Sequence, residues 1–200
     1  MFPRKLAAIF YRIVNPLVAH ALRARGVLLG EAPTFYGVPQ VSRHHGSTIE
    51  IGRRVIVCSD SRFTALSLNH PAKISTVRPE ARIVIGDDVG MSGACIVCAR
   101  SISIGSEVMM GANVMIIDTD FHPVEPVGRR FSDDASRIGV ASVLIGDNVF
   151  LGVGAKVIKG AHIGPDSVVS AAALVVAGEY PAGAILAGNP ARVIGSVYDK

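Results

Sequence analysis

Bulky side chains are scarce in this sequence. Tryptophan is absent and aromatic residues make up only 6% of the 200 residues, although half of the chain is hydrophobic. The apolar residues are mainly valine, isoleucine and alanine, which suit a narrow interior better than the core of a thick layered domain. Charged residues are also few, at 18%, so the composition excludes a disordered chain. The length is sufficient for one sizeable core and demands no second domain.

Cysteine is rare as well, with three residues in the chain: Cys58, Cys95 and Cys98. The spacing of Cys95 and Cys98 matches one half of a zinc or redox motif, but no second pair exists. Cys95 also falls on an interior-type position of the repeat described below. We therefore interpret the thiols as packing residues, expect no metal site, and place the protein in a reducing compartment, the cytoplasm.

The charge is modestly positive, with a net charge of +4 and a pI near 9.2. This balance favours an anionic ligand or surface. The basic residues are dispersed rather than gathered in a tract, so we expect no nucleic-acid partner.

Long apolar runs are absent too: no segment reaches the ~18 uninterrupted apolar residues of a membrane span. Residues 1–29 are predicted to form an amphipathic helical arm, and its basic side chains and the lack of a small-residue cleavage site argue against a secretory signal. The arm either lies on a membrane surface or packs on the body or a neighbouring subunit, and we favour packing. Its apolar residues at helical spacing are Leu6, Ile9, Phe10, Ile13 and Leu17.

A six-residue repeat is the strongest feature of the sequence. A period of six fits neither an α-helix nor a lone strand, but it fits a short strand plus a corner, three of which close a triangular coil. We predict an all-β, parallel β-helix of about seven coils over residues 30–183, followed by a C-terminal tail over 184–200. A weaker version of the repeat runs upstream through Ile51, Val57 and Phe63. The predicted axial residues are Ile85, Met91, Val97, Ile104, Met110, Ile116, Ile145, Leu151, Val157, Ile163, Val169 and Val175.

One interruption breaks the repeat. After Ile116 the chain reads IDTDFHPVEPVGRR, and the next regular hexapeptide begins at Ile145. Residues 118–141 are therefore predicted to form a loop that protrudes from the prism. Long loops on a regular scaffold are usually functional or disordered.

These residues resemble the hexapeptide-repeat acyltransferases. The segments that carry the resemblance are IGDDVGMSGACI, DTDFHP, IGDNVFLGVGAKVIKGAHIG and AGNPARVIG. Within that superfamily the chain is similar to the galactoside and maltose O-acetyltransferases, and more so to bacterial surface-polysaccharide acetyltransferases. The resemblance implies a left-handed β-helix, whereas the general rule for parallel crossovers predicts the opposite hand. It also implies homotrimers that bind acetyl-CoA, the acyl donor co-substrate, between subunits.

The resemblance further implies that the loop carries the catalytic histidine, which is His122 here. An imidazole with an ordinary pKa near 6.5 is suited to take the proton of an attacking sugar hydroxyl. Asp118 and Asp120 are close enough in sequence to orient the ring. Turn formation by these acids, or a backbone carbonyl as the orienting group, are equal alternatives.

The coenzyme is expected along the C-terminal coils. Small residues there, Gly152, Val153 and Ala171, allow close approach of a pantetheine arm. The resemblance adds Phe150, an aromatic that packs against cofactor or acceptor, and Arg192, an arginine near the nucleotide.

The sequence therefore predicts an acetyl-CoA-dependent O-acetyltransferase that acts on a saccharide in polysaccharide or lipopolysaccharide biosynthesis, with possible membrane association through the arm. N-acetylation of an amino sugar and an inactive β-helix binding module remain alternatives. A zinc hydrolyase on the same fold needs three converging histidines, and the repeat region from Ile85 to Val175 contains only His122 and His162.

Overall fold

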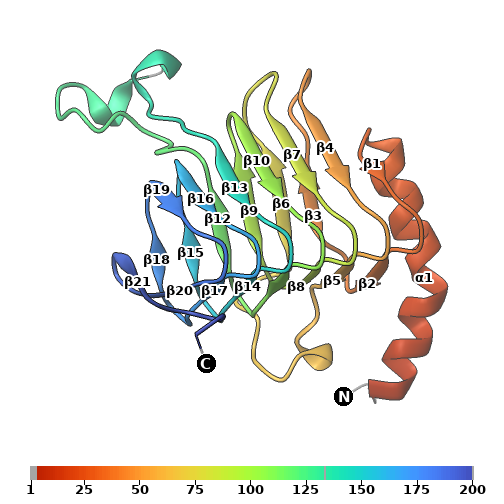
Figure 1. Cartoon of the computed structure of the whole chain (residues 1–200). Helices are drawn as coiled ribbons and strands as arrows, with labels where there is room; N and C mark the ends of the chain where they lie inside the picture. The colour runs from red at the N-terminus through yellow and green to blue at the C-terminus, as the bar shows by residue number, and fades with distance from the viewer. Residues whose placement is uncertain (1–3, 133, 200) are drawn as a thin grey trace.

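The computed structural model describes residues 4–132 and 134–199. Three sheets form the faces of a triangular prism (Figure 1). Sheet 1 contains β1 (Leu28–Leu29), β4 (Thr48–Ile51), β7 (Arg82–Ile85), β10 (Ser101–Ile104), β13 (Val143–Ile145), β16 (Ala161–Ile163) and β19 (Gly178–Tyr180). Sheet 2 contains β2 (Thr34–Tyr36), β5 (Ile56–Cys58), β8 (Gly90–Ser92), β11 (Met109–Met110), β14 (Phe150–Leu151), β17 (Val168–Val169), β20 (Ala184–Gly188) and β21 (Ala191–Ser196). Sheet 3 contains β3 (Gln40–Ser42), β6 (Lys73–Thr76), β9 (Cys95–Cys98), β12 (Met115–Ile117), β15 (Lys156–Val157) and β18 (Leu174–Val175).

Neighbouring strands within each sheet are three strands apart in the chain, so each triangular coil takes one strand from every sheet. Six complete coils run from β1 to β18, and β19 and β20 begin a seventh, which confirms the predicted number. β20 pairs in parallel with β17 and antiparallel with β21. The sheet thus continues beyond residue 183, where the sequence had suggested a tail.

The core is a column of stacked aliphatic side chains along the prism axis. In sheet 1 the residues Ile51, Ile85, Ile104, Ile145 and Ile163 are paired in register from coil to coil, and all are buried. Burial of each such side chain contributes about 1.5–3 kcal/mol. The same position therefore has to be aliphatic in every coil, which is why the repeat is visible in the sequence.

The prediction of one axial residue, Val97, is wrong. Ile96 is fully buried and pairs with the axial Ile116, whereas Val97 points to the outer face of sheet 3. The corner before β9 is one residue shorter than the repeat requires, and it turns at Gly93, whose φ is +56°. Cys95 is consequently on the outer face and half-buried, not in the interior position that its sequence spacing indicated.

The upstream reading of Phe63 is also wrong. Phe63 lies in the 3₁₀ turn η1 (Ser61–Phe63), inside an insertion that joins β5 to β6, and its ring stacks on that of Tyr36 at 4.6 Å. The axial position in this coil belongs to Ile74, which is buried. The insertion displaces the repeat, so hexapeptide counting assigns the wrong residue.

Helix α1 (Arg4–Ala24) covers the N-terminal end of the prism (Figure 1). Val18 and Leu22 are buried there, and the Asn15 side-chain oxygen accepts a hydrogen bond of 2.8 Å from the Phe35 backbone N–H. One face of the predicted arm thus packs on the body. No helix in the described chain has the length and apolar character needed to cross a bilayer.

Candidate active site

The interruption of the repeat is a loop between β12 and β13, and Figure 1 shows it projecting from the prism. It contains two short 3₁₀ turns, η2 (Arg129–Phe131) and η3 (Ala135–Arg137). The loop leaves at the corner between sheets 3 and 1, because β12 belongs to sheet 3 and β13 to sheet 1.

A buried carboxylate anchors the start of the loop. Asp118 is fully buried, and its two oxygens accept hydrogen bonds from the backbone N–H groups of Ala99, Arg100 and Ser101 at 2.6, 2.7 and 2.8 Å. The Cys98 thiol donates a fourth at 3.2 Å. Burial and then the negative charge of the carboxylate raise the pKa of this thiol to about 12, so it stays protonated and remains a donor. Asp118 therefore fastens the loop to the preceding coil.

A second anchor closes the base of the loop. Thr119 and Val140 form an antiparallel bridge, and the Asp120 backbone N–H donates to the Gly139 carbonyl at 3.0 Å. The Asp120 carboxylate lies 3.3 Å from the Lys159 ammonium. A Cβ at position 139 would come within 2.4 Å of Asp120 Oδ2, so a larger residue there would require the Asp120 carboxylate to move. Asp120, like Asp118, has a partner other than the histidine ring.

His122 is exposed on the outgoing arm of the loop. Its ring lines a cavity of about 550 Å³ together with Pro126, Arg129 and Arg130, which we call the loop cavity. No hydrogen bond reaches the ring from any residue in the described ranges. The imidazole thus has both nitrogens available to a substrate, and the orienting role predicted for the two acids does not occur in this conformation.

The loop arginines brace the loop itself. The Arg129 guanidinium donates to the carbonyls of Val124 and Glu125, the latter at 3.4 Å. Arg137 donates to the Val127 carbonyl at 2.7 Å. These hydrogen bonds stabilise the conformation of the loop around the loop cavity.

The residues predicted for the coenzyme are brought partly together. Gly152, Val153 and Ala171 stack at the corner between sheets 2 and 3, a group we call the corner column. A Cβ on Gly152 would lie 2.5 Å from the Ala171 backbone nitrogen, so Gly152 is needed for coil stacking and is itself buried. Val153 and Ala171 are exposed, and Phe150 precedes them as an exposed ring on β14.

Arg192 lies apart from this group on β21. It is opposite Ala187 in the terminal antiparallel pair, and its guanidinium bonds its neighbouring carbonyl, that of Ala191, at 3.0 Å. The side chain is exposed and belongs to the last hairpin of sheet 2.

His122 and the corner column lie at opposite edges of sheet 3. The loop leaves at the corner between sheets 3 and 1, and the column occupies the corner between sheets 2 and 3. A three-residue strand such as β12 spans about 10 Å. The base of the loop and the corner column are therefore separated by the width of sheet 3.

Three of the other histidines have local partners. His70 contacts the Pro71 carbonyl at 2.9 Å, His44 the His45 carbonyl at 2.7 Å, and His162 the Glu179 carboxylate at 2.6 Å. Within the described residues no group of three or more potential metal ligands converges.

Sequence reasoning missed two residues that shape the loop, Gly139 and Lys159. Gly139 lies in a stretch without repeat, and its close approach to the Asp120 carboxylate is visible only in the fold. Lys159 occupies a coil corner more than thirty positions after the start of the loop, so no local pattern connects it to Asp120.

The known proteins with similar sequences are acetyltransferases. No family model matches the chain. A galactoside O-acetyltransferase of Lactococcus lactis is 37% identical over 99 residues, which cover 50% of this chain and 45% of that protein. A 2,3,4,5-tetrahydropyridine-2,6-dicarboxylate N-acetyltransferase of Clostridium perfringens is 44% identical over 57 residues, covering 28% and 24%. The match thus spans about half of the galactoside enzyme's length and a quarter of the other.

Solved structures share the fold over most of the chain. A hexapeptide-repeat-containing acetyltransferase of Vibrio cholerae aligns with a TM-score of 0.59 and 20% identity over 98% of this chain and 91% of that one. The N-acyltransferase AntD of Bacillus cereus, solved with dTDP and 3-hydroxybutyryl-CoA, aligns with a TM-score of 0.67 and 14% identity over 89% and 87%. The fold is a left-handed parallel β-helix. Over about half of its length the chain is similar in sequence to named acetyltransferases, and it shares its fold with hexapeptide-repeat acetyltransferases of known structure.

Proposed function

We propose that the protein is an acetyl-CoA-dependent O-acetyltransferase that acts on a saccharide hydroxyl in polysaccharide or lipopolysaccharide biosynthesis. The observation that carries the proposal is the exposed His122 ring, which lines the loop cavity and has no partner within the described chain. The acetyl-transfer names of the sequence relatives support the reaction class. The coenzyme A thioester in the AntD structure supports the donor.

The reaction needs one base. The oxygen of the sugar hydroxyl attacks the carbonyl carbon of the thioester while His122 takes the hydroxyl proton. A carbon–oxygen bond forms, the carbon–sulfur bond breaks, and the imidazolium returns the proton to the departing sulfur. The products are an acetylated sugar and the free thiol of coenzyme A. Asp118 and Asp120 contribute by fixing the base of the loop from which the ring projects.

The corner column suits the donor. Val153 and Ala171 are exposed small residues, and a Cβ at the adjacent Gly154 would meet no atom within 4 Å, so a ligand can approach the backbone closely. Phe150 offers an exposed aromatic surface beside them. A neutral pantetheine arm is expected to lie along such a surface, because its amides bond backbone groups and its methylenes pack on apolar atoms.

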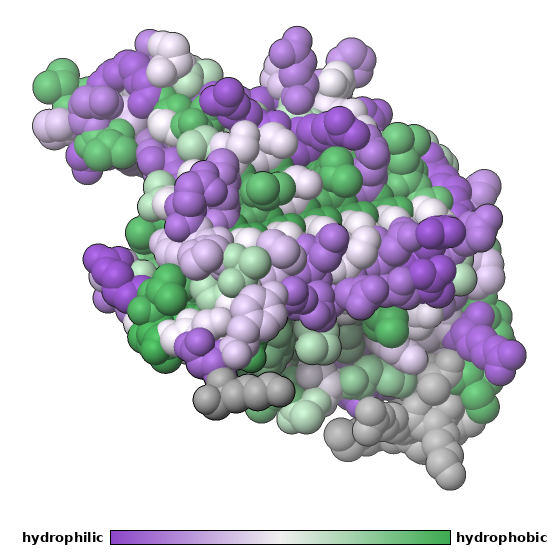
Figure 2. All heavy atoms as spheres, viewed as in Figure 1, coloured by the Kyte–Doolittle hydropathy of each residue, from purple (hydrophilic) through white to green (hydrophobic). Residues whose placement is uncertain are grey.

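The active site is proposed to form between copies of the chain. The base of the loop and the corner column border opposite edges of sheet 3, so we expect a neighbouring copy to bring the histidine of one to the column of the other. The loop carries unusually exposed apolar side chains: Val124 at 66%, Val127 at 79% and Phe131 at 85%. Figure 2 shows apolar surface on this projecting lobe. Such a surface is typical of a protein contact, and three copies arranged cyclically would close into a homotrimer.

The chemistry is tested by measuring thiol release from acetyl-CoA with a panel of neutral, acidic and amino sugars. His122→Ala is expected to lower kcat by about 10²–10⁴-fold, the contribution of a general base. His162→Ala is the matched control, because His162 is paired with Glu179 on the surface of sheet 1 and lies outside the loop. Equal turnover by His122→Ala and the parent would refute the proposal. Transfer confined to amino sugars would assign N-acetylation instead.

The shared site is tested by complementation. His122→Ala removes the base, and Val153→Arg is expected to block the corner column with a long side chain. Refolding equal amounts of the two variants together should restore roughly a quarter of parental activity. Random mixing places an intact His122 next to an intact corner column at about a quarter of the subunit interfaces. If each protomer held a complete site, the mixture would be as inactive as its components.

A further inference from the structure

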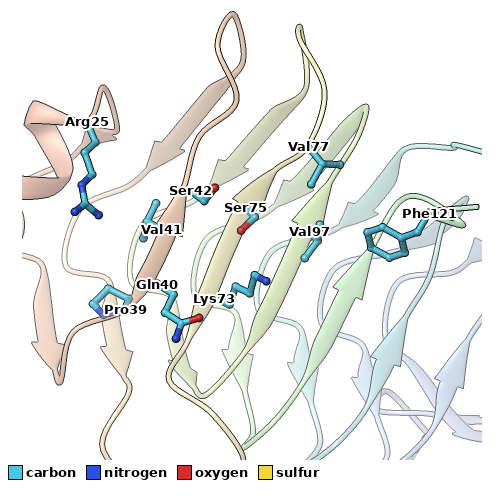
Figure 3. Close-up of a pocket in the computed structure, with 10 residues that line it drawn as sticks. All are labelled: Arg25, Pro39, Gln40, Val41, Ser42, Lys73, Ser75, Val77, Val97 and Phe121. Atoms are coloured by element: carbon cyan, nitrogen blue, oxygen red, sulfur yellow. The ribbon is translucent and has the colours of Figure 1, made fainter. Parts of the chain in front are cut away.

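A groove crosses the outer face of sheet 3, on the N-terminal side of the loop. Its floor is β3, β6 and β9, with Arg25 at the α1 end and Phe121 at the loop end (Figure 3). We call it the sheet-3 groove. Its volume of about 740 Å³ lies within the range of small-molecule sites, about 300–1,000 Å³.

The sheet-3 groove is cationic. Arg25 and Lys73 line it, and no acidic residue of the described chain does so. Figure 3 shows Arg25 at the α1 end of the groove and the Lys73 side chain over the floor. Neither side chain forms an ion pair within the described ranges. Both charges are therefore available to a ligand anion.

A buried hydroxyl lies in the floor between these cations and Phe121. Ser75 is 4% exposed, and its Oγ has no hydrogen-bond partner among the described residues. It is in register with Ser42 on β3 and Val97 on β9, all on the outer face. Buried hydroxyls are almost always bonded, so an orphan in the floor of a groove points to a ligand group.

The loop end of the groove is aromatic. Phe121 is held at a positive φ of 62°, and its half-exposed ring closes the groove over Val97. An aromatic face can pack against the C–H face of a sugar ring. The next residue in the chain is His122, so a sugar that packs on Phe121 lies at the base of the loop that carries the proposed base.

We propose that the sheet-3 groove binds the acceptor and selects a saccharide that carries an anionic group, either a phosphate or a carboxylate. Lys73 and Arg25 hold the anion, the hydroxyls of Ser75 and Ser42 bond sugar oxygens, and Phe121 packs on the ring. The acceptor role rests on the proposed acetyl transfer, whereas the binding does not.

The binding is measured by isothermal titration calorimetry on the full chain without acetyl-CoA. The ligands are a hexose 1-phosphate, the matching hexuronate, the neutral hexose and inorganic phosphate. One of the charged sugars should bind at least tenfold more tightly than the hexose, and the comparison of phosphate with carboxylate identifies the anion. Lys73→Gln should weaken that binding roughly tenfold, the loss of one charge-assisted bond. Equal binding of inorganic phosphate and the sugar phosphate would overturn the saccharide assignment.

The control variant is Lys156→Gln. Lys156 is on the same outer row of sheet 3 as Lys73, connected through Cys95 and Met115, but it does not line the groove. It should leave the affinity unchanged. Equal losses in both variants would indicate a diffuse charge effect and overturn the site.

His122→Ala separates this inference from the proposed function. It should retain the calorimetric affinity for the charged sugar while losing turnover. If the parent protein binds the charged sugar but never acetylates it, the proposed acetyl transfer is refuted and the proposed ligand site in the sheet-3 groove stands. If the parent acetylates neutral sugars and Lys73→Gln is fully active, the acetyl transfer stands and the ligand site in the groove is refuted.

A different observation carries a second inference, about α1. Its outward face exposes Ile9, Phe10, Ile13 and Leu17, at 58, 54, 69 and 66%. This face is opposite the residues that pack on the prism, and α1 is the outermost element at the N-terminal end (Figure 1). Residues 1–30 contain five arginines and lysines and no acid.

We infer that this face docks on an anionic lipid surface. A helix with an apolar stripe beside basic residues inserts at the boundary of headgroups and acyl chains, and the positive charge attracts anionic lipid. The lack of any acid in this segment matches a negative partner, whereas a second copy of the same basic helix would be repelled.

Co-sedimentation with phosphatidylcholine vesicles, with and without phosphatidylglycerol, tests the inference. The parent should bind the anionic vesicles, and the double variant Ile13→Ser/Leu17→Ser should bind at least tenfold less. Ile56→Ser is the control, because Ile56 is a similarly exposed residue on sheet 2. Failure of the parent protein to bind anionic vesicles would refute the inference. A changed sedimentation coefficient of the double variant in the absence of lipid would also refute it, because that result would show that this face of α1 contacts another copy of the chain.

Discussion

The role of Asp118 can be decided by its effect on stability. Its carboxylate accepts three backbone N–H groups and a thiol in a fully buried setting. Asp118→Ala leaves these donors without an acceptor. Each buried unsatisfied group costs about 1–3 kcal/mol, and partial entry of water lowers the sum. We expect the variant to lose about 3–6 kcal/mol of the free energy of unfolding.

Asp118→Asn is the milder form of the same change. One oxygen remains to accept, but the amide presents N–H groups toward backbone N–H donors, so we expect a loss of about 2–4 kcal/mol. Asp120→Asn is the matched control. Its carboxylate pairs with Lys159 at 3.3 Å with side chains 26% and 34% exposed, and such pairs contribute about 0–1 kcal/mol.

Urea unfolding followed by far-UV circular dichroism at one protein concentration measures these differences, since the chain lacks tryptophan. Thiol release from acetyl-CoA is measured on the same samples. The reasoning fails if Asp118→Asn unfolds within about 0.5 kcal/mol of the parent while its turnover falls a hundredfold. That pattern would make Asp118 a positioning residue for the base and not an anchor of the loop.

Three further outcomes are expected. Gly139→Ala should cost about 0.5–1 kcal/mol and speed hydrogen exchange in the loop, because its Cβ would come within 2.4 Å of Asp120 Oδ2 and displace this carboxylate from Lys159; Gly90→Ala, whose Cβ meets no atom within 4 Å, should be within about 0.5 kcal/mol of the parent. Cys98 should resist iodoacetamide at pH 8 until the protein is unfolded, since a pKa of about 12 leaves almost no thiolate there; rapid native labelling would contradict the buried bond. Phe131→Ser should lower the oligomeric state in sedimentation velocity and, with it, the activity; an unchanged assembly would separate the loop tip from any subunit contact.

The parts of the fold that repeat could be predicted from the sequence. Each axial position meets the same neighbours in every coil, so Ile104, Ile145 and Ile163 are selected by one environment and share one spacing. Where the register shifts, the spacing misleads. The short corner at Gly93 moved the axial position from Val97 to Ile96.

The site was predictable only where its residues are contiguous. The loop and His122 stand out because they interrupt a pattern. The sheet-3 groove does not, since Arg25, Lys73 and Phe121 are far apart in the chain and meet only because β3, β6 and β9 stack. Ser75 was hidden as well, because the insertion before β6 displaces the repeat and obscures which residues of that strand face outward.

The location of both candidate sites follows from the regularity of the prism. A coil whose axial residues are stacked in register cannot move its backbone without breaking the contacts of the coils above and below. Long insertions that carry new side chains can therefore enter only where the chain leaves the register. The two longest departures, between β5 and β6 and between β12 and β13, leave from the two opposite edges of sheet 3. Arg25, which follows α1, lies at the N-terminal end of this sheet. Sheet 3 is thus the one face bordered by irregular elements on several sides, which is why a groove could form on it and why the proposed base projects at its edge.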